Sequence, residues 1–434
     1  MSTASTSQPH DIHERVLRAF PAGSNGEFDF PEELSIVIEH GEGPEVWDTE
    51  GTNYIDFSMG WGSALVGHAN QRVITAAAAQ ARLGANFACV NRRSLELAER
   101  LISISPACDQ VRFCASGTEA TQYCGRIARA NTGRTKILKF EGAYHGANDL
   151  GVTSLFPCKQ RPFPSPERSC NGTTENAADQ ILIAPYNDLD TTEDIVLSNA
   201  DELAAIIVEP LHRCLKPSPG FLQGLRSLCD RENIILIFDE VVTGFRLAFG
   251  GAIQYYGVTP DLIAYGKALG GGFPIGVFGG KKDLLEIVQE SRMNQKPYVW
   301  TASTLGGNPV TCAAAWAALD HLEQPGVYQH LHETGTYLRE GLKNTMAEIG
   351  ITGRVIGDGP LAQFIFSPDP VTDYRSTRAG DRAKARRIML GLIQRGIFLN
   401  PMGTKLYIST EHTSEHCDVL IDAFRQSLIH DRTH

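Results

Sequence analysis

The sequence lacks the signatures of several kinds of site. Its ten cysteines include no C-x-x-C pair, and no cysteine–histidine cluster has the spacing of a zinc site. No segment supplies the roughly 20 uninterrupted apolar residues that a membrane helix needs. A basic excess is also missing, because 39 lysines and arginines stand against 50 aspartates and glutamates, for a net charge of −11. We therefore expect no metal site, no membrane association and no nucleic-acid partner.

The N-terminus and the cysteines both favour a cytoplasmic location. The first residues include early acidic side chains and no apolar h-region, which argues against a secretory signal. Several cysteines lie inside apolar runs, as Cys114 does in VRFCA. Reduced, structural thiols in a cytoplasmic protein fit both features. The basic stretch 381–387 is expected to be the solvated face of a helix.

The order of apolar runs predicts an α/β fold. With 434 residues the chain is too long for one compact core, which favours two domains or one domain with lobes. Apolar strands are expected at 111–115, 136–140, 204–210 and 234–240, with helices at 118–130 and 221–231. Continuous apolar strands separated by helices indicate a parallel sheet that is covered on both faces.

Other segments have simpler patterns. Residues 46–57 alternate as a hairpin does, and 70–85 and 94–105 have helical periodicity. The glycine-rich stretch 266–280 is expected to be a loop and a further strand pair. Residues 157–176 form a polar, proline-rich insert of the kind that is usually functional or mobile. From about 325, helices and short strands suggest a second, α+β lobe.

A phosphate site is one interpretation of Ser116-Gly117-Thr118. These residues follow an apolar strand and open a helix. Unpaired amides at a helix N-terminus, with hydroxyls beside them, bind phosphate. The alternative is an ordinary N-cap with Glu119 in the first turn, and taken alone it is the better interpretation.

Asp239 and Lys267 both follow buried strands. Ligands bind at the carboxyl ends of such strands. A buried Asp239 there would be satisfied by the protonated nitrogen of a pyridine ring, and the pairing would make that ring an electron sink. A structural aspartate or a metal ligand is the alternative. Lys267 precedes a glycine run, and desolvation would leave it the free amine that imine chemistry needs. A P-loop lysine is excluded, because Ala268 stands where serine or threonine is required.

The motif EGAYHG follows the strand at 136–140. Tyr144 or His145 at that strand edge would stack on a flat cofactor, and core packing is equally consistent with the pattern.

The order of SGTEA, EGAYHG, VEP, FDEVVTGFR, YGKALGGG and TASTLGGNP resembles the class III aminotransferases of fold type I, which use pyridoxal 5′-phosphate. The resemblance runs from about Pro21 to the end and is strongest to the glutamate-1-semialdehyde aminomutase branch. It implies a large domain with a mainly parallel mixed sheet flanked by helices, plus a smaller α+β lobe. We expect an N-terminal arm and part of the small domain at 1–80, the cofactor-binding domain at 81–324 and the C-terminal small domain at 325–434.

The resemblance also implies roles for the residues that match the motifs. Lys267 carries the cofactor as a Schiff base and shuttles a proton, while Asp239 keeps the pyridine nitrogen protonated. Val241 and Tyr144 cover the two ring faces, with His145 beside them. The remaining cofactor residues are Ser116, Gly117 and Thr118 at the phosphate, Glu209 near the phenolic oxygen, and Thr304, which reaches the phosphate in a neighbouring subunit of a homodimer.

The chain departs from the aminomutase pattern around the substrate. Trp61 is expected to line the pocket, but Asn25–Asp29 carries acid where the aminomutases have an arginine for the substrate carboxylate. The glycine- and serine-rich gating loop of the aminomutases is also replaced here. After Glu209-Pro210 come Leu211-His212-Arg213-Cys214, and we hypothesise that His212 or Arg213 faces the substrate in place of the missing arginine. The alternative is an arginine turned to solvent or to a structural carboxylate.

Ping-pong transfer of an amino group from an amine or amino acid to a keto acid or aldehyde is the function these features favour. An aminomutase acting on a semialdehyde is the alternative. A nicotinamide oxidoreductase would need G-x-G-x-x-G, and only GEGPEV at 41–46 approaches it. The third possibility is a protein that binds a cofactor without catalysis, such as a sensor domain. The sequence shows no regulatory domain that would support it.

Overall fold

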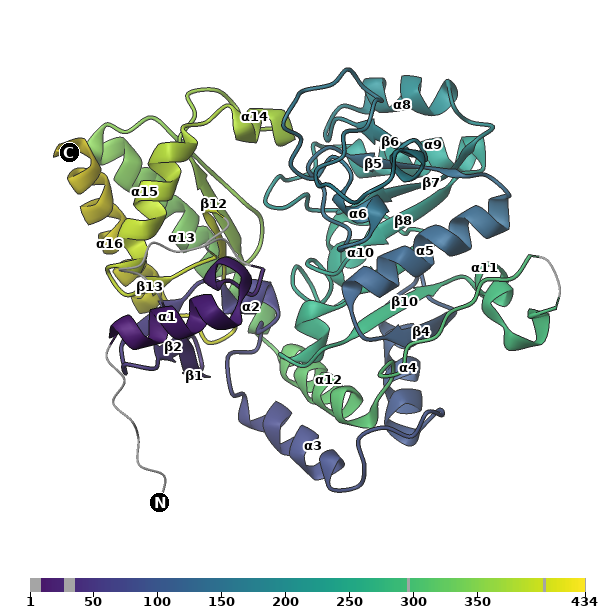
Figure 1. Ribbon diagram of the computed structural model, residues 1–434, viewed down its shortest axis with the longest axis horizontal. Coiled ribbons are helices and arrows are strands. Elements are labelled where there is room, and N and C mark those ends of the chain that lie inside the picture. The colour runs from purple at the N-terminus through teal and green to yellow at the C-terminus, as the bar shows by residue number, and fades with distance from the viewer. Residues whose placement is uncertain (1–8, 27–35, 295–296, 401–402, 434) are drawn as a thin grey trace.

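Two lobes lie side by side in the computed structural model, which describes residues 9–26, 36–294, 297–400 and 403–433. The larger lobe contains one sheet, and the smaller lobe contains two (Figure 1). Within the described residues, no helix is long and apolar enough to cross a membrane.

The large sheet has seven strands in the order β4-β10-β9-β8-β7-β5-β6. Strand β10 runs antiparallel to both of its neighbours, and the pairs from β9 to β6 are parallel. The sheet is therefore mixed and mainly parallel, as expected. Its strands are β4 Gln110–Cys114, β5 Lys136–Phe140, β6 Ile181–Ala184, β7 Leu203–Val208, β8 Ile235–Asp239, β9 Leu262–Tyr265 and β10 Gly276–Gly280.

Alternate residues of the central strands feed two separate cores. On β8, Leu236 and Phe238 join the core that includes α9, whereas Ile235 and Ile237 join the core that includes α5. Both faces are thus buried, which explains why these strands are apolar throughout. The helices of this lobe are α3 Gln71–Ala81, α4 Arg92–Ile104, α5 Gly117–Thr132, α8 Leu189–Leu197, α9 Phe221–Glu232, α10 Gly251–Tyr256 and α12 Pro309–Leu322, with short turns α6 Asp149–Val152, α7 Glu175–Ala178, α11 Lys282–Leu285, η3 Lys267–Gly270, η4 Glu286–Val288 and η5 Glu290–Arg292. The short turn α2 Met59–Gly62 contacts the smaller lobe.

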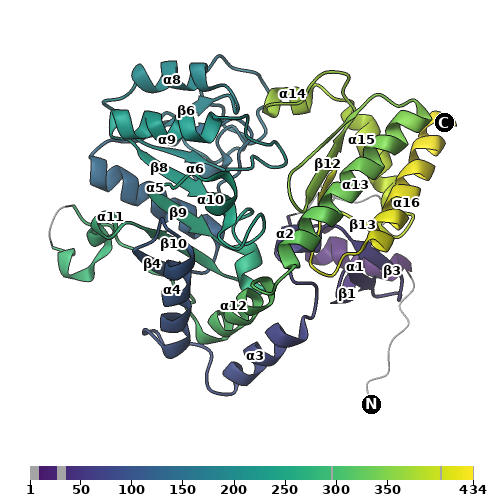
Figure 2. The same ribbon diagram turned by 180° about the vertical axis from the view of Figure 1, so that it is seen from behind.

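The smaller lobe joins the two ends of the chain. Its first sheet, β1-β2-β3-β13, contains the expected hairpin, and β13 adds to β3 in parallel. Its second sheet, β11-β12-β14, is antiparallel. Figure 2 shows α13, α15 and α16 beside these sheets. The bounds are β1 Ile38–Glu42, β2 Glu45–Asp48, β3 Asn53–Asp56, β11 Arg354–Ile356, β12 Leu361–Ile365, β13 Ile397–Phe398, β14 Lys405–Tyr407, α1 Pro9–Ala19, η1 Pro21–Gly23, α13 Val327–Ile349, α14 Tyr374–Arg378, α15 Arg382–Ile393 and α16 Ser414–Thr433.

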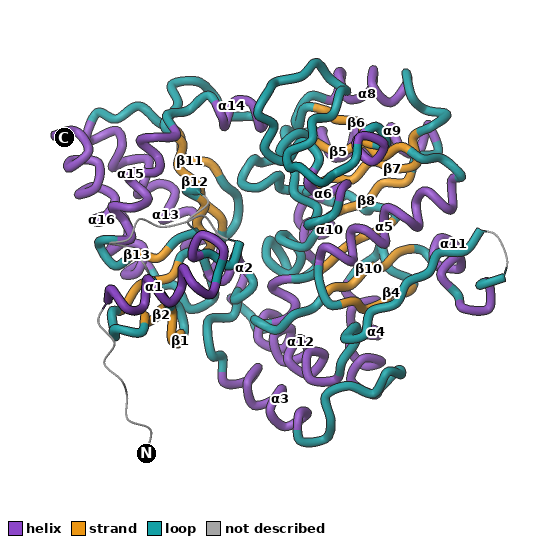
Figure 3. Tube along the Cα trace, viewed as in Figure 1, coloured by secondary structure: helices purple, strands orange, loops and turns teal. Residues whose placement is uncertain are grey.

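The structure differs from the expected elements mainly in the glycine-rich stretch 266–280. The strand pair predicted within 266–280 is wrong, because that stretch holds the 3-10 turn η3 and the single strand β10. Gly271 and Gly272 have positive φ angles of 57° and 97°. Two such residues in a row form a turn and not a β-strand. The boundary proposed at residue 80 falls at the end of α3, which packs against α12 of the larger lobe. Figure 3 shows how much of the chain between α6 and α8 is loop, as expected for the proline-rich insert.

Candidate active site

A cavity of about 820 Å³ lies at the carboxyl ends of the large-sheet strands and is closed on one side by the smaller lobe. Gln363, Asn400 and Tyr407 of the smaller lobe contribute to its wall. The sequence-predicted residues that line it are Trp61, Ser116, Gly117, Thr118, Tyr144, His145, Glu209, Arg213, Asp239, Val241 and Lys267. Residues from strand ends far apart in the sequence therefore meet in one cavity.

A buried aspartate–histidine pair forms the floor. Asp239 is the last residue of β8 and is 5% exposed, and its Oδ2 lies 2.7 Å from Nδ1 of His145. Its Oδ1 accepts a hydrogen bond from the Val241 amide at 3.0 Å. The other ring nitrogen of His145, Nε2, is buried without a partner among the described residues. The pair fixes the carboxylate at the point where a pyridinium nitrogen would need it.

The N-terminus of α5 forms a narrow cradle. Ser116 caps the helix, and its Oγ accepts the Glu119 amide at 3.2 Å, so the N-cap interpretation is correct as well. In the described structure the amides of Gly117 and Thr118 have no acceptor, which leaves them available to an anion. A Cβ on Gly117 would stand 2.8 Å from both methyl groups of Val241, so only glycine fits without displacement.

Lys267 stands at the start of η3, directly after β9. Its φ of 42° is unusual for a residue with a side chain and turns it into the cavity. Burial lowers the pKa of the Lys267 ammonium, and the charges of Tyr407 and Asp239 oppose this only in part. The environment therefore favours the uncharged amine more than water does.

Glu209 joins two loops of the cavity wall. Its Oε1 accepts the Tyr144 amide at 2.8 Å, and its Oε2 accepts the Arg213 amide at 3.0 Å. Burial alone would raise the pKa of Glu209, but His212, His145 and Arg213 together bring it down to about 2. The carboxylate is thus ionised and holds both loops at the cavity.

The candidate substrate residues divide into two groups. Arg213 lines the cavity, donates from Nε to the Gly142 carbonyl at 2.8 Å, and has a buried Nη2 that lacks a partner in the described structure. Trp61 is 39% exposed and lies on the same wall. His212 lies outside this cavity and stacks on Tyr186 with ring centroids 4.9 Å apart. Thr304 is exposed and also lies outside, with its carbonyl bonded to Asn86 Nδ2 at 3.1 Å.

Sequence reasoning missed the contribution of the C-terminal strand β14. Lys405 and Tyr407 both line the cavity, and the Lys405 amine lies 4.8 Å from the Tyr407 ring centroid. Arg246 approaches that ring at 5.4 Å and donates from Nε to Val242 at 2.9 Å. Arg246 ends the motif FDEVVTGFR, so that motif already contained a signal, whereas KLY in β14 contained none.

Together these groups fit a phosphorylated pyridine aldehyde. The two unpaired amides would bind its phosphate, the carboxylate held by His145 would pair with its ring nitrogen, and the Lys267 amine, whose pKa is lowered, would react with its aldehyde. Part of the departure noted at Asn25–Asp29 lies outside the described residues, and Gly26, the last described residue of that segment, lines the cavity.

Comparison with known proteins agrees with this geometry. The class III aminotransferase family model matches residues 30–428. A glutamate-1-semialdehyde 2,1-aminomutase from Desulforudis audaxviator is 38% identical over 397 residues, 90% of each chain. An omega-transaminase from Sphaerobacter thermophilus superposes with a TM-score of 0.90 at 33% identity over 98% of each chain. A β-phenylalanine aminotransferase from Variovorax paradoxus gives 0.84 at 29% identity, over 96% of this chain and 93% of its own. The chain belongs to the class III aminotransferase family and is an enzyme that depends on pyridoxal 5′-phosphate.

Proposed function

We propose that this enzyme is an aminotransferase that moves an amino group from a small amine or amino acid to a separate keto acid or aldehyde. The observation that carries the proposal is the meeting of Lys267, Asp239 and the α5 N-terminus in one cavity. When bound, pyridoxal phosphate supplies a reactive aldehyde and a ring that accepts electrons. The chain's own residues must then orient the substrate and move its protons.

We assign tasks to the residues that line the cavity. Lys267 Nζ holds the cofactor and then moves a proton at the substrate carbon that bears nitrogen. Asp239, fixed by His145, keeps the ring nitrogen protonated. The amides of Gly117 and Thr118, with Ser116 beside them, bind the phosphate. Val241 and Tyr144 confine the ring.

The alternative is an aminomutase, as the relative from Desulforudis audaxviator is named. It would use the same residues but return the amino group to the molecule that supplied it. The omega-transaminase of Sphaerobacter thermophilus, which matches 98% of this chain, supports transfer between two substrates.

A spectroscopic half-reaction separates these functions. The holoenzyme should lose its visible cofactor absorbance when an amine donor is added, and regain it only when a separate carbonyl acceptor follows. Conversion of glutamate 1-semialdehyde into the isomer whose amino group has moved to the neighbouring carbon, with no second substrate present, would show an aminomutase instead. Lys267→Ala should lack the covalent absorbance band, which makes it the control for the signal.

We further propose a cytoplasmic homodimer. Large apolar side chains are exposed in two neighbouring segments, Leu83, Phe87 and Val90 before α4, and Trp300 and Leu305 before α12. The Asn86–Thr304 hydrogen bond joins these segments, so they form one apolar surface of the kind that subunits bury. Thr304 would then approach the partner's cofactor. Sedimentation should show a dimer, and Leu305→Asp should weaken it.

The ten cysteines are all unpaired, which supports a reducing compartment.

A further inference from the structure

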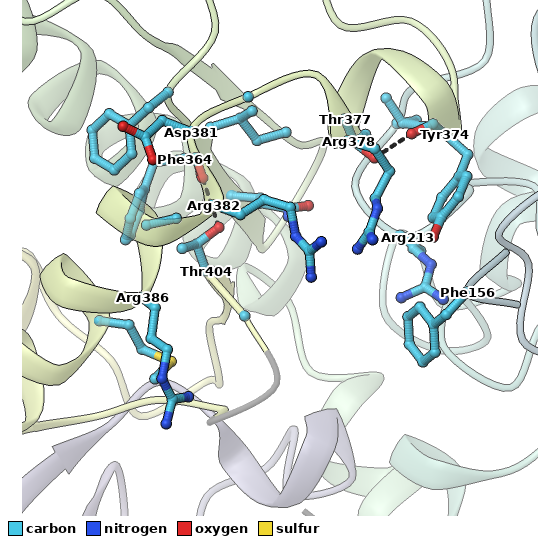
Figure 4. Close-up of a pocket in the computed structure, with 18 of the residues that line it drawn as sticks. Phe156, Arg213, Phe364, Tyr374, Thr377, Arg378, Asp381, Arg382, Arg386 and Thr404 are labelled. Atoms are coloured by element: carbon cyan, nitrogen blue, oxygen red, sulfur yellow. Dashed lines mark hydrogen bonds between the residues drawn. The ribbon is translucent and has the colours of Figure 1, made fainter. Parts of the chain in front are cut away.

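A second cavity of about 410 Å³ lies between α14, α15 and β12 of the smaller lobe and the loops that carry Phe156 and Arg213 (Figure 4). Its wall is largely apolar, with Phe364, Phe366 and Met389 among its residues. It adjoins the cofactor cavity, because the same side chains line both. The shared residues are Phe156, Arg213, Gln363, Gly403 and Thr404.

Arginines from α14 and α15 project into this second cavity. Figure 4 shows the guanidinium groups of Arg378, Arg382 and Arg213 directed toward a common space. Within the described part of the chain, no carboxylate lies within ion-pairing distance of Arg378 or Arg382. The arginines of the same helices that point elsewhere are paired. Arg375 binds Glu141 at 2.7 Å, and Arg387 binds Asp431 at 2.6 Å.

Buried polar atoms without partners face the same space. Arg213 Nη2, Tyr374 Oη and both ring nitrogens of His212 have no hydrogen-bond partner in the described structure, and all three residues line the cavity. Tyr374 is 6% exposed and His212 is fully buried. Burial raises the pKa of Tyr374, so its hydroxyl remains a proton donor. Leaving such groups unpaired is costly, and a ligand that accepts hydrogen bonds would satisfy the N–H and O–H donors among them.

We propose that this second cavity binds the distal oxyanion of the substrate, a carboxylate or a phosphate separated by an apolar segment from the end that reacts at Lys267. The guanidiniums and the tyrosine hydroxyl supply charge-assisted hydrogen bonds to the oxyanion. The phenylalanines contact the apolar segment. Arg213, whose guanidinium lies 5.3 Å from the Phe156 ring, stands where the two cavities meet. This inference rests on the proposed aminotransferase function and specifies its substrate class.

The kinetic test compares amino donors of equal length that differ only at the far end. One pair has a carboxylate or a carboxamide, and the other has a phosphate or a hydroxyl. Arg378→Gln and Arg382→Gln should each lower kcat/KM for the anionic donors roughly ten- to a hundred-fold, the loss expected for one charge-assisted hydrogen bond. The neutral donors should be unaffected. Arg387→Gln is the matched control, because Arg387 lies on α15 but pairs with Asp431 outside the cavity.

A binding measurement tests the cavity independently of turnover. Glutarate, adipate, suberate and inorganic phosphate are titrated calorimetrically into the holoenzyme. Binding should persist in Arg387→Gln and disappear in the Arg378→Gln/Arg382→Gln double variant, whose circular dichroism and cofactor absorbance report that it is folded. Preference for the dicarboxylates or for phosphate identifies which oxyanion the substrate carries.

The outcomes separate this inference from the proposed function. An enzyme that transfers amino groups but treats anionic and neutral donors alike, and binds none of the probes, overturns the second cavity's role and leaves the aminotransferase standing. Probe binding that depends on the two arginines, in an enzyme that transfers no amino group between molecules, keeps the anion site and overturns the aminotransferase.

Discussion

Replacing Lys139 by methionine should destabilise the protein strongly, although Lys139 does not line either cavity. Lys139 lies on β5 and is fully buried. Its ammonium nitrogen lies within 2.8–3.2 Å of the carbonyl oxygens of Ala143, Leu150, Gly151 and Thr153. Those carbonyls belong to the loop that presents Tyr144 and His145 and to the short helix that follows. Burial lowers the pKa of Lys139 to about 7, but carbonyl oxygens at hydrogen-bond distance favour its protonated form.

The magnitude follows from the number of donors. An ammonium group has three N–H donors, and each buried carbonyl left without a donor costs about 1–3 kcal/mol. Methionine fills much of the same volume, so the cavity cost is small. The free energy of unfolding should therefore fall by at least about 3 kcal/mol, which is a large fraction of the stability of an ordinary domain.

Urea unfolding of Lys139→Met and Lys136→Met provides the comparison. Lys136 lies on the same strand, but it pairs with the exposed Glu202, so its loss should cost about 1 kcal/mol or less. The Lys139 variant should also hold its cofactor more weakly, because the loop that carries Tyr144 is released. Equal urea midpoints for the two variants would refute the assignment of Lys139 as the residue that holds this loop.

Three further variants test other parts of the structure. Burial raises the pKa of the Glu240 carboxyl from 4.5 to about 7, so the folded state binds more protons than the unfolded state between these pH values. The free energy of unfolding should therefore fall by about 3 kcal/mol as pH rises through this range. Glu240→Gln should remove this dependence in urea unfolding at several pH values. Gly117→Ala places a methyl group against Val241, so cofactor affinity measured by absorbance should fall at least tenfold, and Val241→Ala should restore much of it. Lys405→Met should raise KM for carboxylate substrates about tenfold with little change in kcat, and an unchanged KM would remove Lys405 from the substrate wall.

The central sheet could be predicted because its strands are buried on both faces. That burial makes β7 and most of β8 continuous apolar runs, and the motif residues follow at the carboxyl ends of the strands. Asp239 and Lys267 could therefore be predicted from their places after strands, together with the glycine run after Lys267 and the resemblance to the class III motifs, and both line one cavity. The direction of β10 could not be predicted, because apolar periodicity is the same in parallel and antiparallel strands. The expectation of a strand pair at 266–280 failed for another reason, because η3 and the turn at Gly271 and Gly272 occupy the first half of the stretch and leave β10 as its single strand.

Contacts between distant segments left no local signal. Strand β13 has two residues and pairs with β3 near the other end of the chain. The stretch 381–387 has the pattern of a solvated helix face, and Arg382 and Arg387 are both exposed, but nothing in that pattern indicates that Arg382 also lines a cavity whose wall the larger lobe completes. His212 and Arg213 are adjacent in the sequence, yet Arg213 lines the cofactor cavity and His212 does not.

The sequence identity of the whole chain and the choice of substrate depend on different residues. A relative's identity over the whole chain therefore says little about which reaction this enzyme catalyses. The 38% of positions shared with an aminomutase and the 33% shared with an omega-transaminase both preserve the fold, and the role proposed for Lys267 is the same in the two reactions. The reactions differ in whether a carbonyl product leaves, which depends on the cavity walls. Here Arg213 joins a cavity of about 820 Å³ to one of about 410 Å³ that contains unpaired guanidiniums. A substrate that occupies both cavities must extend well beyond the reacting carbon, so the walls around Arg213, Arg378 and Arg382 weigh more in assigning this reaction than the identity of the whole chain.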